Sequence, residues 1–194
     1  MPLEICVDNE NIELMKSFVF NEQQEFCINL TSSKRDGKTV YSFNIDTISQ
    51  GIHETLNDGR LRAACKYKHY STVIFHSHPK LSRSYPSYED IIKLRHEYIK
   101  ISIIATRWGI YTIKKSSKSK DVNLLSETIK SKIYGYLNHI QALEDSTGYS
   151  RRNSLSGNLS LEQQQINELA FYIGRIGEHT KLYFKFYPWS HFNL

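Results

Sequence analysis

The spacing of apolar residues along the chain predicts short strands alternating with longer helices. Helical spacing is clear in 122–143, in 161–177 and in a run of about a dozen residues that contains 12–19. A further helix is predicted at 87–98, directly after a proline. Short runs rich in apolar and β-branched residues predict strands at 3–7, 25–30, 39–45, 71–75, 101–106, 109–114 and 182–187.

Turn-forming residues separate these elements. The polar run 32–37 ends in Asp-Gly and predicts the turn of a hairpin between two of the strands. The region 46–70 is less regular, and there Ile48, Ile52 and Leu56 would share one face of a helix. Asn57-Asp-Gly59 marks a break after that face.

The bulk composition is that of one soluble globular domain. The chain has 194 residues, of which 40% are hydrophobic and 23% charged, so it can bury a core without disulfides. Because hairpins and flanking helices are mixed, the expected fold class is α/β (mixed α+β), with a mixed β-sheet flanked by helices. We expect 1–115 to form the functional core. Residues 116–194 would add C-terminal helices and a closing strand to the same domain, with a mobile loop near 145–160.

Charge and cysteine content narrow the functional classes. The net charge of +5 comes from scattered Lys and Arg, so nucleic-acid binding is not indicated. Cys6, Cys27 and Cys65 are odd in number and lack CxxC spacing, which argues against a disulfide framework and against a cysteine zinc site. We expect reduced thiols in a cytoplasmic protein. The chain shows no signal peptide and no apolar run of about 18 residues, so we expect neither secretion nor a membrane span.

The segment from His76 to Asp90 carries the pattern that predicts chemistry. His76 and His78 stand two residues apart at the end of a predicted strand, so their side chains leave the same face. Pro79 ends that strand at its edge. Ser87 and Asp90 have the spacing of a capping box at a helix start, which would aim the Asp90 carboxylate back toward the histidines.

Two histidines and one carboxylate make three protein ligands. A fourth position left open for water is typical of a catalytic zinc site, although a helix cap beside two ordinary histidines would show the same residues. Metal-assisted hydrolysis also needs a group that moves protons, for which a carboxylate is well suited. Among the upstream acidic residues Glu25 is the strongest candidate, because it begins the strand-like segment EFCINL.

These residues resemble the JAMM (JAB/MPN) metalloproteases, in which an upstream glutamate precedes His-x-His-Pro and Ser-x-x-Asp. The matching residues are Glu25, then His76-Ser-His-Pro79, then Ser87-Tyr-Glu-Asp90. The resemblance extends over residues 3 to about 114 and implies the cytidine-deaminase-like architecture of that family.

The resemblance also implies roles for the individual residues. Zn²⁺ would be bound by His76, His78 and Asp90, Glu25 would be the general base, and Ser87 would stabilise the oxyanion. Eight residues separate the second histidine from the serine, one more than is usual in the family. That extra residue leaves open whether Asp90 or its neighbour Glu89 supplies the carboxylate ligand.

The function implied by the resemblance is that of a zinc-dependent isopeptidase. Its substrate would be the isopeptide bond of ubiquitin or a ubiquitin-like protein joined to lysine, and it would work within a larger protein assembly. Two alternatives stay open. One is a JAMM-type peptidase that acts on another protein, and the other is a non-catalytic MPN-fold scaffold that binds partner proteins.

Overall fold

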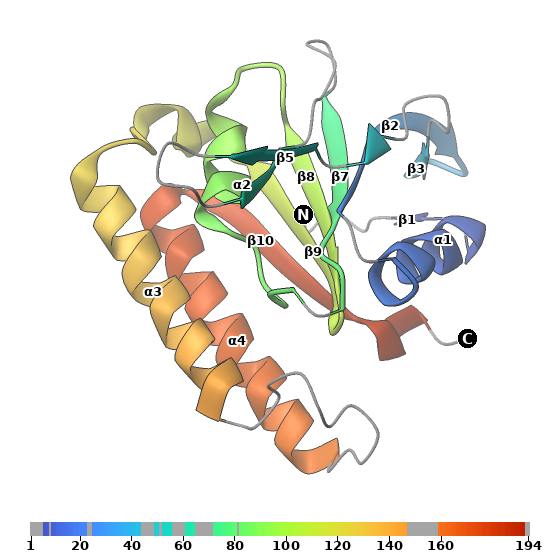
Figure 1. The fold of residues 1–194 in the computed structure, drawn as a ribbon. Coiled ribbons are helices and arrows are strands. Elements are labelled where there is room, and N and C mark those ends of the chain that lie inside the picture. The colour runs from blue at the N-terminus through green and yellow to red at the C-terminus, as the bar shows by residue number, and fades with distance from the viewer. Residues whose placement is uncertain are drawn as a thin grey trace.

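A mixed β-sheet lies at the centre of the computed structural model (Figure 1). The structure describes residues 6–7, 9–22, 25–43, 49–50, 52–55, 61–64, 72–80, 82–146 and 159–192. Within these residues the sheet has eight strands, in the order β1-β3-β2-β7-β8-β9-β10, with β4 also paired to β2. A separate two-stranded sheet is formed by β5 and β6.

Most neighbouring strands of the main sheet are antiparallel. The exceptions are the pairs β1–β3 and β7–β8, which are parallel. The connection from β7 to β8 passes through helix α2, as a parallel pair requires. The strand bounds are β1 Cys6–Val7, β2 Phe26–Arg35, β3 Lys38–Phe43, β4 Ser49–Gln50, β5 Ile52–Thr55, β6 Leu61–Ala64, β7 Val73–Ser77, β8 Ile101–Thr106, β9 Gly109–Lys115 and β10 Leu182–Pro188.

Helices cover both faces of the sheet. Figure 1 shows α3 and α4 side by side on the same side as α2, with α1 on the opposite side. The bounds of the helices and 3-10 turns are α1 Asn9–Phe20, α2 Tyr88–Ile92, η2 Lys93–Arg95, η3 Ser117–Asp121, α3 Glu127–Ser146, α4 Leu159–Thr180 and η4 Trp189–Phe192. The predicted mixed α/β class is therefore confirmed.

Two hydrophobic cores lie on the two faces of the sheet. In β8, Ile103 packs into the core with α1, whereas Ile104 packs into the core with α2, α3 and α4. In β7 the same alternation sends Phe75 to the α1 core and Ile74 to the other. Since both faces are buried, all residues of β7 and β8 are buried.

The β2–β3 hairpin is longer than the sequence predicts. The predicted hairpin is confirmed, but its turn is shorter than the run 32–37, because β2 continues to Arg35 and only Asp36 and Gly37 form the turn. Their φ angles are 50° and 75°, and positive values at both positions suit a two-residue hairpin. Exposed polar residues thus belong to the strand, since pairing with β3 provides hydrogen-bond partners for their backbone groups.

Several other boundaries differ from prediction. Ile52 lies in β5 rather than on a helical face. The helix expected at 87–98 is α-helical only to Ile92, and the helix expected from residue 122 begins at Glu127. Of the predicted loop near 145–160, residues 147–158 lie outside the part of the chain that the structure describes. The strands expected at 101–106, 109–114 and 182–187 and the first helix are confirmed.

The expectation of reduced cysteines is wrong for Cys27. This residue is disulfide-bonded and is 1% exposed. Cys65 lies outside the described residues. Among the helices that the structure describes, none combines the length and apolar character needed to cross a membrane.

Candidate metal centre

The two histidines extend from the C-terminal end of β7 into one buried space. His76 is the fourth residue of this five-residue strand, and His78 follows it directly. Strand alternation puts both rings on the face that carries Ile74, and His76 and His78 are 0% and 2% exposed. The intervening Ser77 faces away, and its Oγ accepts a hydrogen bond of 3.0 Å from the backbone N–H of Phe26 in β2.

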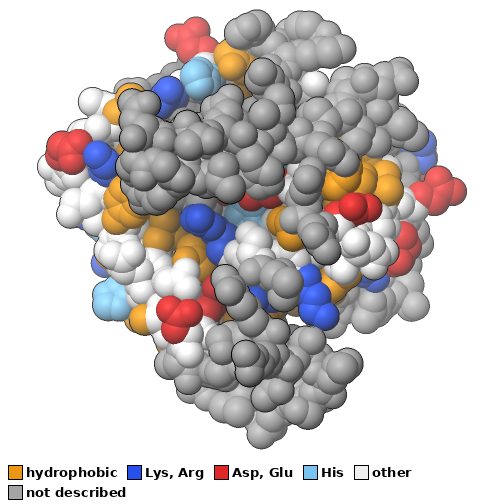
Figure 2. Space-filling model, in the orientation of Figure 1, with side chains coloured by type: hydrophobic (Ala, Val, Ile, Leu, Met, Phe, Trp, Pro, Cys, Tyr) orange, Lys and Arg blue, Asp and Glu red, His pale blue; other side chains and the backbone are white. Residues whose placement is uncertain are grey.

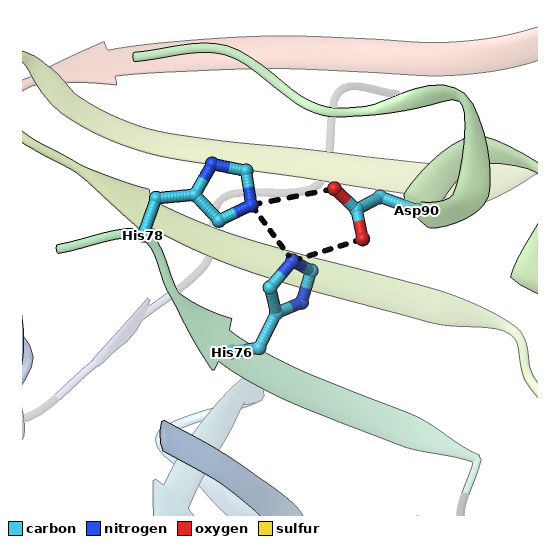
Figure 3. Close-up of side chains that lie close together, drawn as sticks. All are labelled: His76, His78 and Asp90. Atoms are coloured by element: carbon cyan, nitrogen blue, oxygen red, sulfur yellow. Dashed lines mark hydrogen bonds and ion pairs between the residues drawn. The ribbon is translucent and has the colours of Figure 1, made fainter. Parts of the chain in front are cut away.

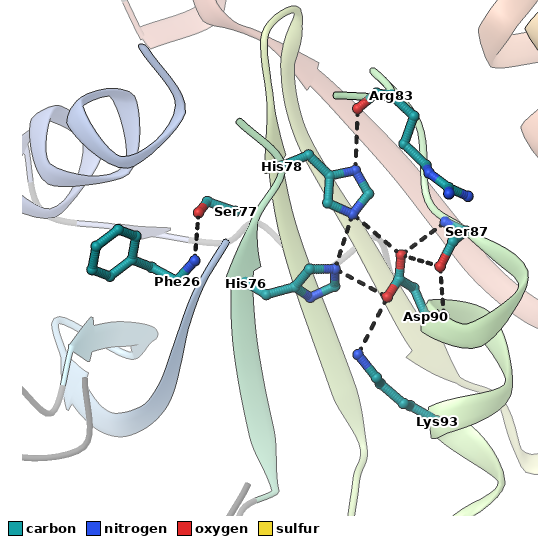
Figure 4. Close-up of polar contacts among 8 residues, drawn as sticks. All are labelled: Phe26, His76, Ser77, His78, Arg83, Ser87, Asp90 and Lys93. Carbon is teal, nitrogen blue, oxygen red and sulfur yellow. Dashed lines mark hydrogen bonds and ion pairs between the residues drawn. The ribbon is translucent and has the colours of Figure 1, made fainter. Parts of the chain in front are cut away.

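Helix α2 begins with the capping box that the sequence predicts. The Oγ of Ser87 accepts a hydrogen bond from the backbone N–H of Asp90 at 3.1 Å. In return the Asp90 Oδ2 accepts from the backbone N–H of Ser87 at 2.8 Å and from its hydroxyl at 2.7 Å. The box fixes the rotamer of Asp90, which is 4% exposed, so that its carboxylate turns back toward the histidines (Figure 4).

The three side chains converge on one point (Figure 3). The Nε2 atoms of His76 and His78 are 3.2 Å apart. The Oδ1 of Asp90 lies 3.0 Å from His76 Nε2, and its Oδ2 lies 3.4 Å from His78 Nε2. In a tetrahedral zinc site with ligand bonds of about 2.0–2.2 Å, neighbouring ligand atoms are about 3.3–3.6 Å apart. The spacing between the two Nε2 atoms is close to that value, and one ligand atom from each of the three residues lies within 4.8 Å of the others, so the group could bind a metal ion.

A backbone carbonyl orients the second histidine. The Nδ1 of His78 lies 3.2 Å from the carbonyl oxygen of Arg83, which can only accept a hydrogen bond. The proton of the neutral ring is therefore on Nδ1, and Nε2 presents a lone pair to the shared space. The Nδ1 of His76 is buried and has no hydrogen-bond partner among the described residues.

Local electrostatics favour the protonation states that metal binding needs. Burial lowers the pKa of His76 below its ordinary value, which favours the neutral ring. Burial alone would raise the pKa of Asp90, but the neighbouring side chains of His76, Lys93 and His78 together outweigh it. The pKa of Asp90 is therefore held well below its usual range, and the carboxylate is ionised. A neutral imidazole and an ionised carboxylate are the forms that bind metal ions.

Lys93 is a neighbour of the site that the sequence motif does not include. Its Nζ lies 3.3 Å from the Oδ1 of Asp90, and its side chain is 21% exposed (Figure 4). The spacing of three residues from Asp90 on a helical segment was a signal for this contact, since such residues share a face. The ammonium adds positive charge beside the one carboxylate of the group.

The structure separates the two candidates for the carboxylate ligand. Asp90 belongs to the group of ligand atoms that lie within 4.8 Å of one another, whereas its neighbour Glu89 does not. Glu89 is half-buried on another side of the helix. The geometry therefore favours Asp90 as the ligand, as the Ser-x-x-Asp pattern predicts.

The predicted base lies close in the chain to a residue that pairs with His76. Glu25 is half-buried and directly precedes β2, in which Cys27 pairs with His76. The paired register ends at Cys27 and His76, two residues short of Glu25, and Glu25 is not in the group of ligand atoms that lie within 4.8 Å of one another. Its role as general base stays a prediction. So does oxyanion stabilisation by Ser87, whose hydroxyl here donates to Asp90.

Fold and site together define a class: a mixed α/β protein with a buried His-His-Asp group suited to a metal ion. Comparison of the chain with protein-family descriptions, curated proteins and solved structures finds no match. The functional assignment therefore depends on the site geometry and on the resemblance of its residues to the JAMM motif.

Proposed function

We propose that this protein is a metal-dependent hydrolase that cleaves an amide bond, with Zn²⁺ as the metal. The observation that supports the proposal is the buried group of His76, His78 and Asp90, whose ligand atoms lie within 4.8 Å of one another. A set of two imidazoles and one carboxylate suits zinc and leaves a coordination position for water or substrate. The buried capping box and the Arg83 carbonyl hold the ligands in place beforehand.

Different residues of the chain would have separate roles in hydrolysis. Zinc, when bound, supplies Lewis-acid polarisation of the carbonyl and lowers the pKa of water. Glu25 would take a proton from the attacking water and return it to the departing amine. Ser87 would donate a hydrogen bond to the oxyanion once its hydroxyl turns away from Asp90, while the backbone N–H of Ser87 keeps the carboxylate oriented.

For the substrate we propose the isopeptide bond of ubiquitin or a ubiquitin-like protein joined to lysine. The support for this finer proposal is the resemblance to the JAMM motif in the sequence. Conjugates of that kind, and a larger protein assembly around the enzyme, would then be the partners. If the same site cleaves a different protein instead, the substrate proposal is wrong. The proposal of a metal-dependent hydrolase is then still supported.

The first experiment measures metal content and hydrolysis on the same preparations. We expect about one zinc per chain in the wild type and its loss in His78→Ala, because the imidazole is one of three ligands. His139→Ala is the matched control, since His139 is an exposed histidine on α3. A wild type that stays free of metal after incubation with Zn²⁺ would contradict the proposal and favour a non-catalytic scaffold.

A second experiment tests the general base. Glu25→Gln should keep its zinc but lose hydrolysis of di-ubiquitin by a factor of about 10²–10⁴, because the amide cannot accept the proton. Glu22→Gln is the matched control, as Glu22 is exposed and lies just beyond α1. Full activity of Glu25→Gln would assign the base to another residue.

A further inference from the structure

A buried carboxylate on α3 contacts the loop that joins the two parts of the metal site. Glu144, near the end of α3, is 7% exposed. Its Oε1 accepts a hydrogen bond from the backbone N–H of Ser84 at 3.3 Å and a short one from the Ser84 hydroxyl. The same oxygen accepts from Arg107 at 3.0 Å, in an ion pair whose side chains are 14% and 8% exposed.

Two further contacts hold this loop against the same surroundings. Arg107, in the turn between β8 and β9, also donates to the carbonyl oxygen of Lys80 at 3.5 Å. The hydroxyl of Tyr85, 4% exposed, donates to the Oε1 of Gln141 at 2.6 Å. Gln141 and Glu144 are three residues apart on α3 and therefore share a helix face. The loop is thus attached to α3 and to the β8–β9 turn at several points.

The attachment lies between the supports of two metal ligands. Ser84 directly follows Arg83, whose carbonyl orients the His78 ring. Three residues after Ser84 comes Ser87, which caps α2 and fixes Asp90. A shift of the backbone at Ser84 would therefore move a neighbour of His78 and the start of the helix that carries Asp90. Figure 4 shows the Arg83 carbonyl beside the His78 ring and Ser87 beside the Asp90 carboxylate.

Glu144 is costly to bury without its partners. Burial raises the pKa of its carboxyl, against the opposing effects of Arg107 and of the Ser84 backbone N–H. A buried carboxylate with two strong donors is tolerated where the donors stay in place, and loss of one partner leaves an unsatisfied group. The Glu144, Ser84 and Arg107 contacts therefore hold the loop in one position.

We propose that Glu144 is a positioning residue for the metal centre. Together with Arg107 it holds the Ser84 segment in place, so that the ligands His78 and Asp90 keep the spacing that metal binding requires. This inference rests on the proposed metal binding and assigns a role to the C-terminal helices in the site. Partners outside the first ligand shell typically change metal affinity by about 10–100-fold when removed, and we expect the lower end of that range for Glu144→Ala.

The test measures the dissociation constant for Zn²⁺ by chelator competition, with hydrogen exchange of the 82–87 segment in the same proteins. We expect Glu144→Ala to bind zinc about tenfold more weakly and to exchange faster at 82–87, and Glu144→Gln to recover part of both because it keeps an acceptor oxygen. Glu127→Ala is the matched control, since Glu127 is exposed on the same helix. That control should leave both measurements unchanged.

A second control is a variant that lowers the stability of the fold but keeps the Glu144 contacts. Ile173→Ala removes a core side chain that is 2% exposed and lies on α4, not on the helix that carries Glu144. It should lower the melting temperature but leave zinc affinity unchanged in the folded protein. Should Glu144→Ala not fold, Ser84→Ala removes one hydroxyl from the contact and keeps the ion pair.

The outcomes separate this inference from the proposed function. Wild-type zinc affinity and wild-type exchange at 82–87 in folded Glu144→Ala, or in Ser84→Ala where that variant is the one tested, would overturn the positioning role alone. Failure of the wild type to bind zinc would overturn the proposed function, and the positioning role with it. An equal loss of affinity in Ile173→Ala would show that general stability is the cause, and would overturn the role as well.

Discussion

At the scale of single residues, burial determines the chemistry available to the metal centre. The side chains of His76, His78 and Asp90 are 1%, 3% and 5% exposed. Buried polar groups of this kind are stable only when paired, and these three are arranged so that their ligand atoms face one another. A metal ion in that space would be bound by all three side chains. Protons would compete with the metal ion for the same ligand atoms.

The first residue-scale prediction separates two adjacent carboxylates. Asp90→Asn should weaken zinc binding strongly, because the amide is a poorer ligand and carries no charge. Glu89→Gln is the matched control and should bind zinc like the wild type, since Glu89 is not in the ligand group. Chelator competition at one pH measures both. The reverse order of affinities would assign the ligand to Glu89.

The second residue-scale prediction concerns pH. The pKa of His76 is lowered in the folded protein, so the unfolded chain, with a value near 6.5, binds a proton that the folded chain excludes. Because of this difference in proton binding, the free energy of unfolding keeps its full value above pH 6.5 and decreases as pH falls below 6.5. The lowered pKa of Asp90 acts in the same direction at more acidic pH.

Urea unfolding of the metal-free protein between pH 5 and 8 would measure this dependence, with His76→Gln as the variant that lacks the titrating ring. We expect the stability of the wild type to decrease more steeply below about pH 6.5 than that of the variant. Equal slopes in both proteins would contradict the assignment of the effect to His76.

At the scale of elements, the pairing of β9 with β10 depends on a close approach of the two backbones at one glycine. Gly109 opens β9 with φ +154°, opposite Pro188 at the end of β10. A Cβ at this position would lie 2.1 Å from the carbonyl oxygen of Tyr187. Only glycine therefore allows β9 and β10 to pair at this end.

We predict that Gly109→Ala destabilises the protein by about 1–3 kcal/mol or more, because the two backbones must separate or the strand must bend. Gly135→Ala is the matched control, since Gly135 lies within α3 and a Cβ there meets nothing within 4 Å. That change should stabilise the helix by about 0.5–1 kcal/mol. Urea unfolding of both variants gives the comparison, and an unaffected Gly109→Ala would contradict the steric argument.

At the scale of the whole molecule, the chain before and after residue 115 shares one core. The core on the α3 and α4 face contains Ile74, Ile104 and Tyr111 from the sheet. It also contains apolar residues that come later in the chain, namely Leu124, Ile133, Leu137, Ile140, Leu169, Ile173, Ile176 and Leu182. Removal of the second set would expose the apolar face that supports β7.

We therefore predict that a fragment of residues 1–115 does not fold by itself. Circular dichroism in the near ultraviolet should show no fixed aromatic packing, and unfolding should not be cooperative. The full chain is the control. A cooperative fragment that binds zinc would show instead that the metal centre is independent of the C-terminal helices, contrary to the proposed role of Glu144.

Basic and acidic side chains alternate over the coloured part of the surface in Figure 2, and neither sign dominates that view. This distribution agrees with the scattered charges in the sequence. In this view the described residues form no continuous basic surface of the kind that nucleic-acid binding uses.

The sequence by itself determined the features that depend on neighbours a few residues away. The His76 and His78 side chains share a face because strand alternation has a period of two, and Asp90 turns back because the Ser-x-x-Asp spacing forms a capping box. Apolar periodicity likewise predicted α1, β8, β9 and β10, since local spacing decides which face is buried.

Only the tertiary structure decided which distant residues meet. Glu144 and Ser84 are 60 residues apart in the chain, and their contact exists because α3 packs over the ligand loop. The extension of β2 to Arg35 likewise depends on pairing with β3, which overrides the turn-like composition of that segment. Packing between segments is a property of the folded chain as a whole, so no local pattern in the sequence could predict these contacts.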